Sequence, residues 1–391
     1  MKKIIFVNTH PIPYFTSLYR KLNLKKDIDL KVLYCLDYGV GTHFDKEFNK
    51  EINTSEKILK GYNYQFLKNL FKNKSKVNGL GTALNYEIIF LLFKEPKSKI
   101  ICHGWSNLTL LFILIFGRLF GHDIYLRAEP PLSHEKNYST LKLFFRKIFF
   151  KYFLFNFPSG FLYIGEQNKS FYKYYGVKDD RLFFAPYCVD NQEVAKNKIS
   201  QEESIKVETL INYNNKSKII LFCGKISSKK APLDLLYSFN NLENNYENKL
   251  VFIGDGPLKL KLLEEIDRLN LSNKVICLGH QNLETIYHLY KLCDVFVLPS
   301  GFGETWGLVI NEVMNFGKPI LVSDLVGSST DLICDKNGLV HEHGNLNDIT
   351  TKLEILLSKD KLWVENCYKE STRKLEKFSQ NTVIQCLINL W

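Results

Sequence analysis

Short, nearly continuous apolar runs alternate with longer amphipathic stretches, and this rhythm restricts the fold of the chain more than any other sequence feature. The runs fall at Ile4–Val7, Leu30–Tyr34, Ile100–Cys102, Ile124–Leu126, Phe161–Ile164, Ile219–Phe222, Leu250–Ile253, Val275–Leu278, Val295–Leu298 and Ile320–Val322. Helical patterns lie between them, as at Ser106–Phe120 and Thr140–Phe155. Continuous apolar runs are typical of parallel strands covered on both faces. The sequence therefore predicts an α/β fold of doubly wound parallel sheets.

The length of 391 residues suggests two domains. A polar stretch over 191–218 separates two sets of runs, so we expect a domain over 1–195 and another over 196–377. The tail, 378–391, is apolar again, which predicts a last helix that crosses back onto the first domain. Two Rossmann-like domains facing each other across a cleft would bind ligands in the loops that follow the carboxyl ends of the strands.

The positive charge of the chain is concentrated in its first half. The formal net charge is +11, and residues 1–195 hold 29 Lys and Arg against 17 Asp and Glu, a net of +12, which leaves −1 for the remainder. This asymmetry predicts an anionic partner for the first domain, such as a membrane surface, although a solvated Lys-rich surface would look the same. Nine cysteines without a C-x-x-C pair, and no apolar run long enough to span a bilayer, favour a cytoplasmic protein, soluble or peripheral on a membrane.

Two loops after apolar runs carry residues suited to a sugar nucleotide. The loop after Val295–Leu298 contains Gly301, Gly303 and Glu304, and a helical pattern that begins near Gly307 carries Glu312. Carboxylates accept hydrogen bonds from the hydroxyl groups of sugars, and the first turn of a helix favours phosphate. The loop after Ile219–Phe222 ends in a proline suited to the first turn of a helix, and its lysines can neutralise a diphosphate. A third loop, 254–257, reads Gly-Asp-Gly-Pro and is weak evidence alone.

Together these loops resemble those of the retaining glycosyltransferases of family 4, which belong to the GT-B superfamily. The resemblance spans roughly residues 219–348 and includes Gly-Lys-Pro at 317–319 and Asn-Gly at 337–338. It implies that Gly224, Lys225 and Lys230 bind the diphosphate of the donor. It also implies that Glu304 holds the hexose, that Glu312 holds the ribose, and that the backbone of Trp306, Gly307 and Leu308 closes on the sugar phosphate. Lys225 replaces the usual Arg and keeps the charge but not the bidentate geometry; Trp306 stands where Phe or Pro is commoner.

The first half offers weaker candidates for the acceptor side of the site. His103 follows the run Ile100–Cys102, and Arg127 and Glu129 follow the run Ile124–Leu126. Arg127 is a candidate ligand for a phosphate and Glu129 a candidate neighbour of the acceptor hydroxyl. A structural histidine and an internal Arg–Glu ion pair are equally good interpretations of these residues.

A basic and aromatic stretch over 141–157 is compatible with two roles. Lys142, Arg146, Lys147 and Lys151 are interleaved there with phenylalanines at 144, 145, 149, 150, 153 and 155. This pattern suits a helix that lies on an anionic bilayer, and it equally suits a core helix with a basic solvated edge. A single-stranded nucleic acid partner, which we do not expect, would require these aromatic side chains to be exposed along a basic groove.

The expected reaction is transfer of a hexose-type sugar, with retained configuration, from a nucleoside diphosphate sugar to an acceptor hydroxyl. A UDP-sugar donor is favoured, and a lipid-linked or saccharide acceptor in surface polysaccharide, lipopolysaccharide or glycolipid assembly is expected. No cofactor or metal is required, and an Asp-Ile-Asp sequence at 27–29 stands at the start of a run rather than at its end. The alternatives are a nucleotide-sugar epimerase on the same fold and a non-catalytic protein that binds sugar nucleotide or nucleic acid.

Overall fold

The computed structural model describes residues 1–45, 50–54, 56–71, 79–196, 199–214, 216–243 and 248–391. The chain forms two compact units, an N-terminal unit of Met1–Pro186 with Gln380–Trp391 and a C-terminal unit of Tyr187–Ser379. The division falls earlier than the boundary expected from the polar stretch 191–218. That stretch forms helices α6 (Asn191–Lys196) and α7 (Gln201–Leu210), because single buried residues such as Val194 and Val207 are enough to pack each of them.

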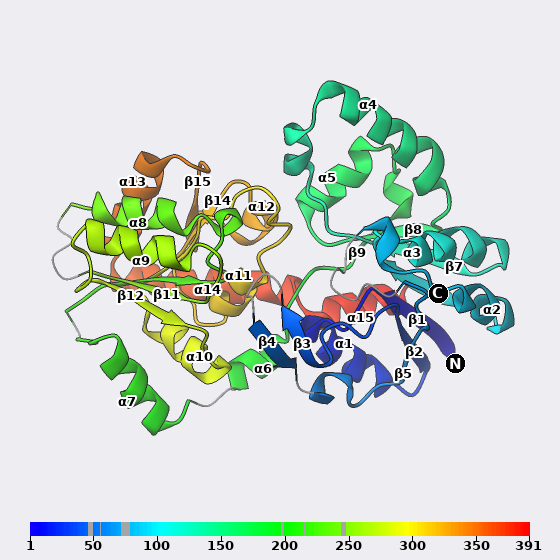
Figure 1. The fold of residues 1–391 in the computed structure, drawn as a ribbon, viewed down its shortest axis with the longest axis horizontal. Coiled ribbons are helices and arrows are strands. Elements are labelled where there is room, and N and C mark those ends of the chain that lie inside the picture. Colours follow the sequence, from blue (N-terminus) through cyan, green and yellow to red (C-terminus); the bar gives the residue numbers. More distant parts are fainter. Residues whose placement is uncertain (46–49, 55, 72–78, 197–198, 215, 244–247) are drawn as a thin grey trace. The chain divides into compact units, whose positions relative to one another are not determined.

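The N-terminal unit is built on a seven-stranded parallel sheet with the strand order β5-β2-β1-β6-β7-β8-β9 (Figure 1). Its strands are β1 (Lys2–Asn8), β2 (Ile28–Tyr34), β5 (Tyr64–Phe66), β6 (Lys99–His103), β7 (Asp123–Arg127), β8 (Gly160–Tyr163) and β9 (Leu182–Phe184). A separate antiparallel pair joins β3 (Gly41–Asp45) to β4 (Lys50–Thr54). The five runs in this half of the sequence are thus confirmed as strands, and the strand order reverses between β1 and β6.

Helices cover both faces of this sheet. They are α1 (Pro13–Asn23), α2 (Glu87–Lys94), α3 (Leu108–Phe112), α4 (Thr140–Ile148), α5 (Glu166–Tyr174) and α15 (Gln380–Ile388). The helical stretches expected over Ser106–Phe120 and Thr140–Phe155 are confirmed, but each contains a π-helical turn, at Ile113–Gly117 and at Phe149–Phe153. At the first turn, a Cβ on Gly117 would lie 2.6 Å from Ile124 Cδ1, so glycine allows this turn to approach the sheet closely.

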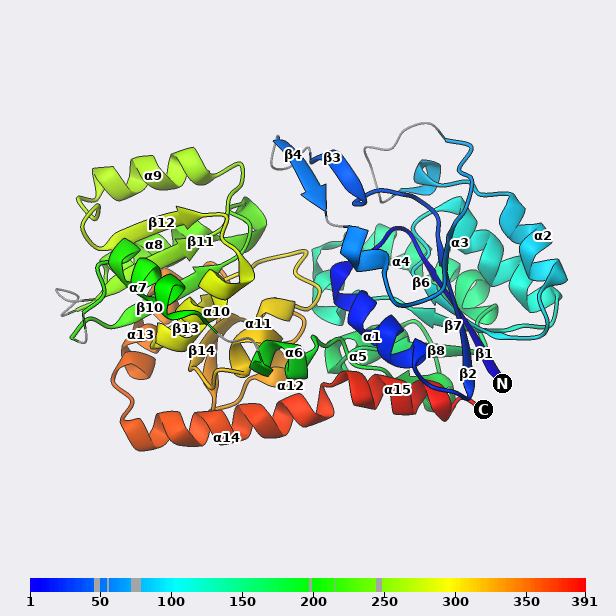
Figure 2. The ribbon, with the colours of Figure 1, turned by 90° about the horizontal axis from the view of Figure 1, so that it is seen from below.

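Helix α15 at the end of the chain belongs to the N-terminal unit and lies beside α1 (Figure 2). The Gln380 side chain donates to Ser17 Oγ over 2.5 Å. After the helix, the Trp391 ring has Lys2 Nζ 5.5 Å and Lys99 Nζ 5.0 Å from its centroid, in cation–π contacts. The last segment is therefore held to the unit at both of its ends.

The C-terminal unit is a six-stranded parallel sheet with the order β12-β11-β10-β13-β14-β15. Its strands are β10 (Ile219–Cys223), β11 (Lys249–Ile253), β12 (Val275–Gly279), β13 (Val295–Leu298), β14 (Ile320–Ser323) and β15 (Gly338–His341). The strand order reverses between β10 and β13, and ligands of open α/β sheets bind at such a reversal, beyond the carboxyl ends of the strands. The prediction of two doubly wound α/β units is confirmed.

Helices again cover both faces of the C-terminal sheet (Figure 1). They are α8 (Pro232–Asn240), α9 (Lys259–Arg268), α10 (Leu283–Leu292), α11 (Leu308–Met314), α12 (Ser329–Leu332), α13 (Leu346–Leu357) and α14 (Lys361–Lys377). Buried side chains of α8, α9 and α13 pack with alternate strand residues in one hydrophobic core. On the other face, Tyr290 of α10 packs against Phe296 of β13, with ring centroids 5.8 Å apart.

Candidate functional site

The loops that follow β10, β11 and β13 are joined by backbone hydrogen bonds at the strand reversal of the C-terminal unit. Gly301 N–H donates to the Lys229 carbonyl over 2.7 Å, and Ile226 N–H donates to the Asp255 carbonyl over 2.9 Å. A Cβ on Gly254, whose φ is +130°, would lie 1.9 Å from the Gly224 carbonyl oxygen. Glycine is therefore required at 254, because any side chain there would clash with the loop that follows β10. Through these contacts the three loops form one rigid rim.

Lys230 and Glu304 form an ion pair at the centre of this rim. Their side chains are only 17% and 9% exposed, so water screens the pair weakly. Lys230 precedes Ala231, which adopts left-handed angles, and Pro232, which begins α8. Lys225 is half-buried at the start of the same loop. Two residues that the sequence assigned to different parts of a ligand, the diphosphate and the hexose, thus contact one another.

Glu312 is held by a tyrosine that the sequence analysis did not identify. The buried Tyr290 hydroxyl donates to Glu312 Oε2 over 3.2 Å. Nearby, burial raises the pKa of the Cys223 thiol to about 12; Tyr290 and Lys230 oppose this rise, and the Glu312 charge adds to it. Cys223 is the last residue of β10, so Lys230 and Glu312 both act on the carboxyl end of that strand, where Lys230 also pairs with Glu304.

A fourth loop fixes the backbone of residues 304–306. Gly327 N–H donates to the Glu304 carbonyl over 3.2 Å, and Ser328 Oγ donates to the Trp306 carbonyl over 2.6 Å. A Cβ on Gly327 would lie 1.8 Å from the Thr305 carbonyl oxygen. Gly327 and Ser328 lie in the loop that follows strand β14, and this Gly-Ser pair was the signal available in the sequence. Tyr290, inside a helix, gave no such signal.

The side chain of Trp306 lies in the core of the C-terminal unit. It is buried, its indole Nε1 donates to Asn311 Oδ1 over 2.9 Å, and its ring packs on Phe378. Gly307 follows with φ +86° as the N-cap of α11, and Leu308 begins that helix. Only the backbone of these three residues is therefore a candidate ligand contact, as the resemblance implied.

The acceptor-side candidates lie at the carboxyl ends of strands in the N-terminal unit. The His103 ring packs edge-on against Phe15, with centroids 4.7 Å apart, and burial and the nearby Arg127 charge hold its pKa well below 6.5. The buried Arg127 guanidinium donates to the carbonyls of Ala185 and Pro186, over 3.0 and 3.2 Å. These contacts give Arg127 a packing role. Glu129 is half-buried after β7. The acceptor roles of His103, Arg127 and Glu129 stay predictions.

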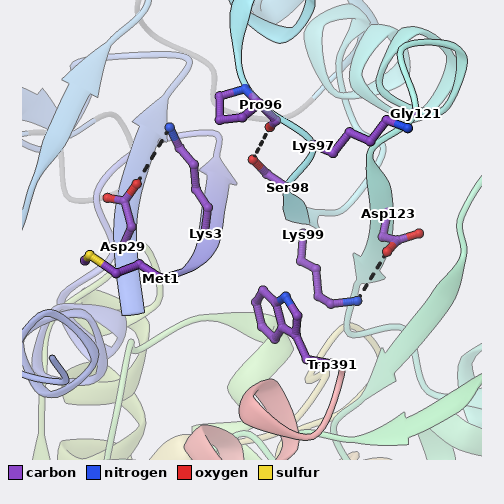
Figure 3. Close-up of a pocket in the computed structure, with 10 residues that line it drawn as sticks. All are labelled: Met1, Lys3, Asp29, Pro96, Lys97, Ser98, Lys99, Gly121, Asp123 and Trp391. Carbon is purple, nitrogen blue, oxygen red and sulfur yellow. Dashed lines mark hydrogen bonds and ion pairs between the residues drawn. The ribbon is translucent and has the colours of Figure 1, made fainter. Parts of the chain in front are cut away.

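A pocket of about 420 Å³ opens at the opposite edge of this sheet (Figure 3). It lies at the amino ends of the strands, where Lys3 faces Asp29 across 3.7 Å and Lys99 faces Asp123 across 3.2 Å. The charges of these four residues are thus paired within the protein, and the pocket stands apart from the strand ends that carry the acceptor-side candidates. Within the described part of the chain, no three His, Cys, Asp or Glu side chains are grouped so as to hold a metal ion.

The basic and aromatic stretch forms an exposed apolar surface, here called the α4 surface. Its exposed side chains are Leu141, Phe144, Phe145, Ile148, Phe149, Tyr152 and Phe153. No residue of α4 is buried, whereas Phe150 and Phe155, beyond the helix, pack in the core of the unit. The core-helix interpretation therefore fails for α4 itself and holds for these two phenylalanines. Among the described residues, no helix has the length and apolar character needed to cross a bilayer.

Arg146 differs from the other three basic residues of this stretch because its side chain is engaged within the unit. Its guanidinium donates to the buried carboxylate of Glu135 over 2.7 and 3.0 Å and to the Tyr175 hydroxyl over 3.2 Å. The carboxylate and the phenol are satisfied only while Arg146 points inward, so it anchors α4 to the unit. Lys142, Lys147 and Lys151 remain at the surface.

Comparison with known proteins supports the interpretation of the C-terminal unit. Residues 205–376 match the family described as Glycosyl transferases group 1. The chain is 29% identical over 196 residues, 49% of each protein, to an uncharacterised glycosyltransferase of Methanocaldococcus jannaschii. It is 30% identical over 176 residues to the N-acetylgalactosamine-N,N'-diacetylbacillosaminyl-diphospho-undecaprenol 4-alpha-N-acetylgalactosaminyltransferase of Campylobacter jejuni, covering 45% of this chain and 46% of the relative. These alignments span about half the length of the two relatives.

The whole chain is similar in fold to a solved structure. It matches Anabaena HepE, crystallised in complex with UDP, with a TM-score of 0.74 and 15% identity, over 100% of this chain and 99% of that one. Residues 205–376, which make up most of the C-terminal unit, thus match the glycosyl transferases group 1 family, and the chain as a whole has the GT-B fold.

Proposed function

We propose that the protein transfers a hexose-type sugar from a nucleoside diphosphate sugar to an acceptor hydroxyl, with retention of the anomeric configuration. The observation that carries this proposal is the gathering of Lys230, Glu304 and Glu312 at one strand end, with Lys225 on the same loop as Lys230. Two cations and two carboxylates at a strand reversal match a donor that joins a diphosphate to two hydroxyl-bearing sugars. UDP is the favoured carrier, because the HepE match was solved with UDP.

In this reaction the lysines stabilise the charge that develops on the departing diphosphate. Glu304 accepts hydrogen bonds from the hexose and Glu312 from the ribose, so both orient the donor. The departing phosphate accepts the proton of the acceptor hydroxyl, and no side chain serves as a covalent nucleophile. The lysines supply the counter-charge, so the proposal calls for no metal or cofactor.

The acceptor is proposed to be a lipid-linked or free saccharide at the inner face of the cell membrane. Two observations support this part of the proposal. The printed name of the Campylobacter relative includes a diphospho-undecaprenol acceptor. The N-terminal unit carries the excess positive charge of the chain and the exposed α4 surface. Surface polysaccharide, lipopolysaccharide or glycolipid assembly is the corresponding role.

The test is incubation of the protein with a panel of nucleotide sugars and polyprenyl-diphosphate-linked saccharides, followed by mass spectrometry of the products. One donor should add a single hexose-type unit to an acceptor, and proton coupling constants should report the donor's own anomeric configuration. Conversion of a donor in the absence of any acceptor would indicate an epimerase. No turnover and no nucleoside diphosphate binding across the panel would refute the proposal.

A further inference from the structure

We infer that Glu304 also selects the sugar-bearing donor over the nucleoside diphosphate product, by competing with the diphosphate for Lys230. The inference rests on the proposed function, which assigns the diphosphate to Lys230 and the hexose to Glu304. The ion pair between these two residues has a consequence for binding, because the Glu304 carboxylate and a phosphate are both anions and repel one another when they approach the same ammonium group.

The geometry restricts this exchange of partners to the two side chains. The Lys230 loop is fixed to the neighbouring loop by the bond from Gly301 to the Lys229 carbonyl. The backbone of Glu304 is fixed by the bond from Gly327. The Lys230 side chain can therefore turn from the Glu304 carboxylate to a phosphate without movement of either loop. The Glu304 carboxylate cannot move with the Lys230 ammonium group, because its backbone is held in place.

A nucleoside diphosphate alone satisfies only half of this pair. When its phosphates take Lys230, the Glu304 carboxylate, only 9% exposed, loses its cation and stays out of water. A buried charge without a partner is strongly unfavourable, and that cost is subtracted from the affinity of the ligand.

A nucleoside diphosphate sugar satisfies both residues. Its phosphates take Lys230 while the vicinal hydroxyls of its hexose donate to Glu304, and charge-assisted hydrogen bonds replace the lost ion pair. The affinity for the nucleoside diphosphate sugar is therefore maintained. The affinity for the nucleoside diphosphate product is lower, because its binding leaves the Glu304 carboxylate without a partner. Recapture of Lys230 by Glu304 then favours release of the product.

Glu312 provides a matched control, because its carboxylate also borders the site but accepts a hydrogen bond from the neutral Tyr290. The measurement is isothermal titration calorimetry with UDP on wild type, Glu304→Gln, Glu312→Gln and the double variant Lys230→Met/Glu304→Gln, each checked for folding by circular dichroism. Glu304→Gln should bind UDP about tenfold more tightly than wild type, as expected for removal of a close competing charge. Glu312→Gln should bind UDP more weakly.

The gain in Glu304→Gln should vanish in the double variant, because it depends on Lys230. In turnover assays, UDP should inhibit Glu304→Gln at lower concentrations than wild type. If wild type binds UDP and folded Glu304→Gln binds it equally or more weakly, the inference is overturned while the proposed function stands. If wild type binds no UDP or other nucleoside diphosphate, the proposed function fails and the inference fails with it.

Discussion

Replacing three phenylalanines of the α4 surface with serine should abolish binding to anionic membranes. Phe144, Phe145 and Phe149 are 58%, 61% and 41% exposed. Complete burial of a phenylalanine contributes about 1.5–3 kcal/mol, so covering the exposed part of each ring is worth about 1 kcal/mol. The four other apolar side chains of this surface are exposed to a similar degree, which gives an upper estimate of about 7 kcal/mol for the whole surface.

The electrostatic contribution is smaller than this apolar one. With Arg146 engaged by Glu135, three lysines remain, and each contributes about 1 kcal/mol near an anionic bilayer. Binding through the four basic residues alone would be reversible and would be released by salt. The structure instead predicts that high salt weakens binding without removing it, because salt screens charges and leaves apolar burial intact.

Flotation with anionic liposomes at low and high salt tests this reasoning. Wild type should float at both salt concentrations, the triple variant Phe144→Ser/Phe145→Ser/Phe149→Ser at neither. Substituting Lys142, Lys147 and Lys151 with Gln should reduce recovery in low salt only in part. Leu260→Ser/Leu283→Ser, at sites 75% and 57% exposed in the C-terminal unit, should float like wild type. Equal recovery of the triple variant and wild type would refute the reasoning, and wild type that ignores liposomes but binds single-stranded DNA would indicate a nucleic acid partner.

Three further predictions concern single residues. Glu312→Ala should weaken nucleoside diphosphate binding in calorimetry, and Tyr290→Phe should cause a smaller loss because it removes only the hydrogen bond that orients the carboxylate; unchanged affinity in both folded variants would contradict the assignment. Lys230→Ala should lower turnover by raising the barrier roughly 2–4 kcal/mol, and an effect confined to the KM for the donor would count against a role in the transition state. The folded protein depresses the pKa of His103, so the unfolded chain binds a proton that the folded one excludes. The free energy of unfolding should therefore fall as the pH drops below 6.5, by up to about 1.4 kcal/mol per pH unit from this group, and urea titrations of His103→Phe should show a flatter dependence.

The strands and the order of the loops could be predicted from the sequence because their signals are local. A buried parallel strand is recognised in the sequence as a continuous apolar run. Ten such runs form strands in the two sheets. Strands β5, β9 and β15, at edges of the two sheets, were not predicted, because strands of three or four residues are too short to stand out as apolar runs. The glycines and lysines of the site and Glu304 stood in loops that follow runs, so their place beyond strand ends followed from the same signal.

The partners of those residues depended on the tertiary structure. Lys230 and Glu304 come from loops that are distant in sequence, and only the strand order that makes β10 and β13 neighbours brings them into an ion pair. Tyr290 reaches Glu312 from the last turn of α10, where nothing in its sequence neighbours marks it. Arg146 belongs to the same basic sequence pattern as three surface lysines. Its side chain nevertheless turns inward, because it pairs with the Glu135 carboxylate and donates a hydrogen bond to the Tyr175 hydroxyl, both from other elements. Sequence determines which segments become strands and which residues end them; which side chains meet is decided when the sheet orders those ends in space.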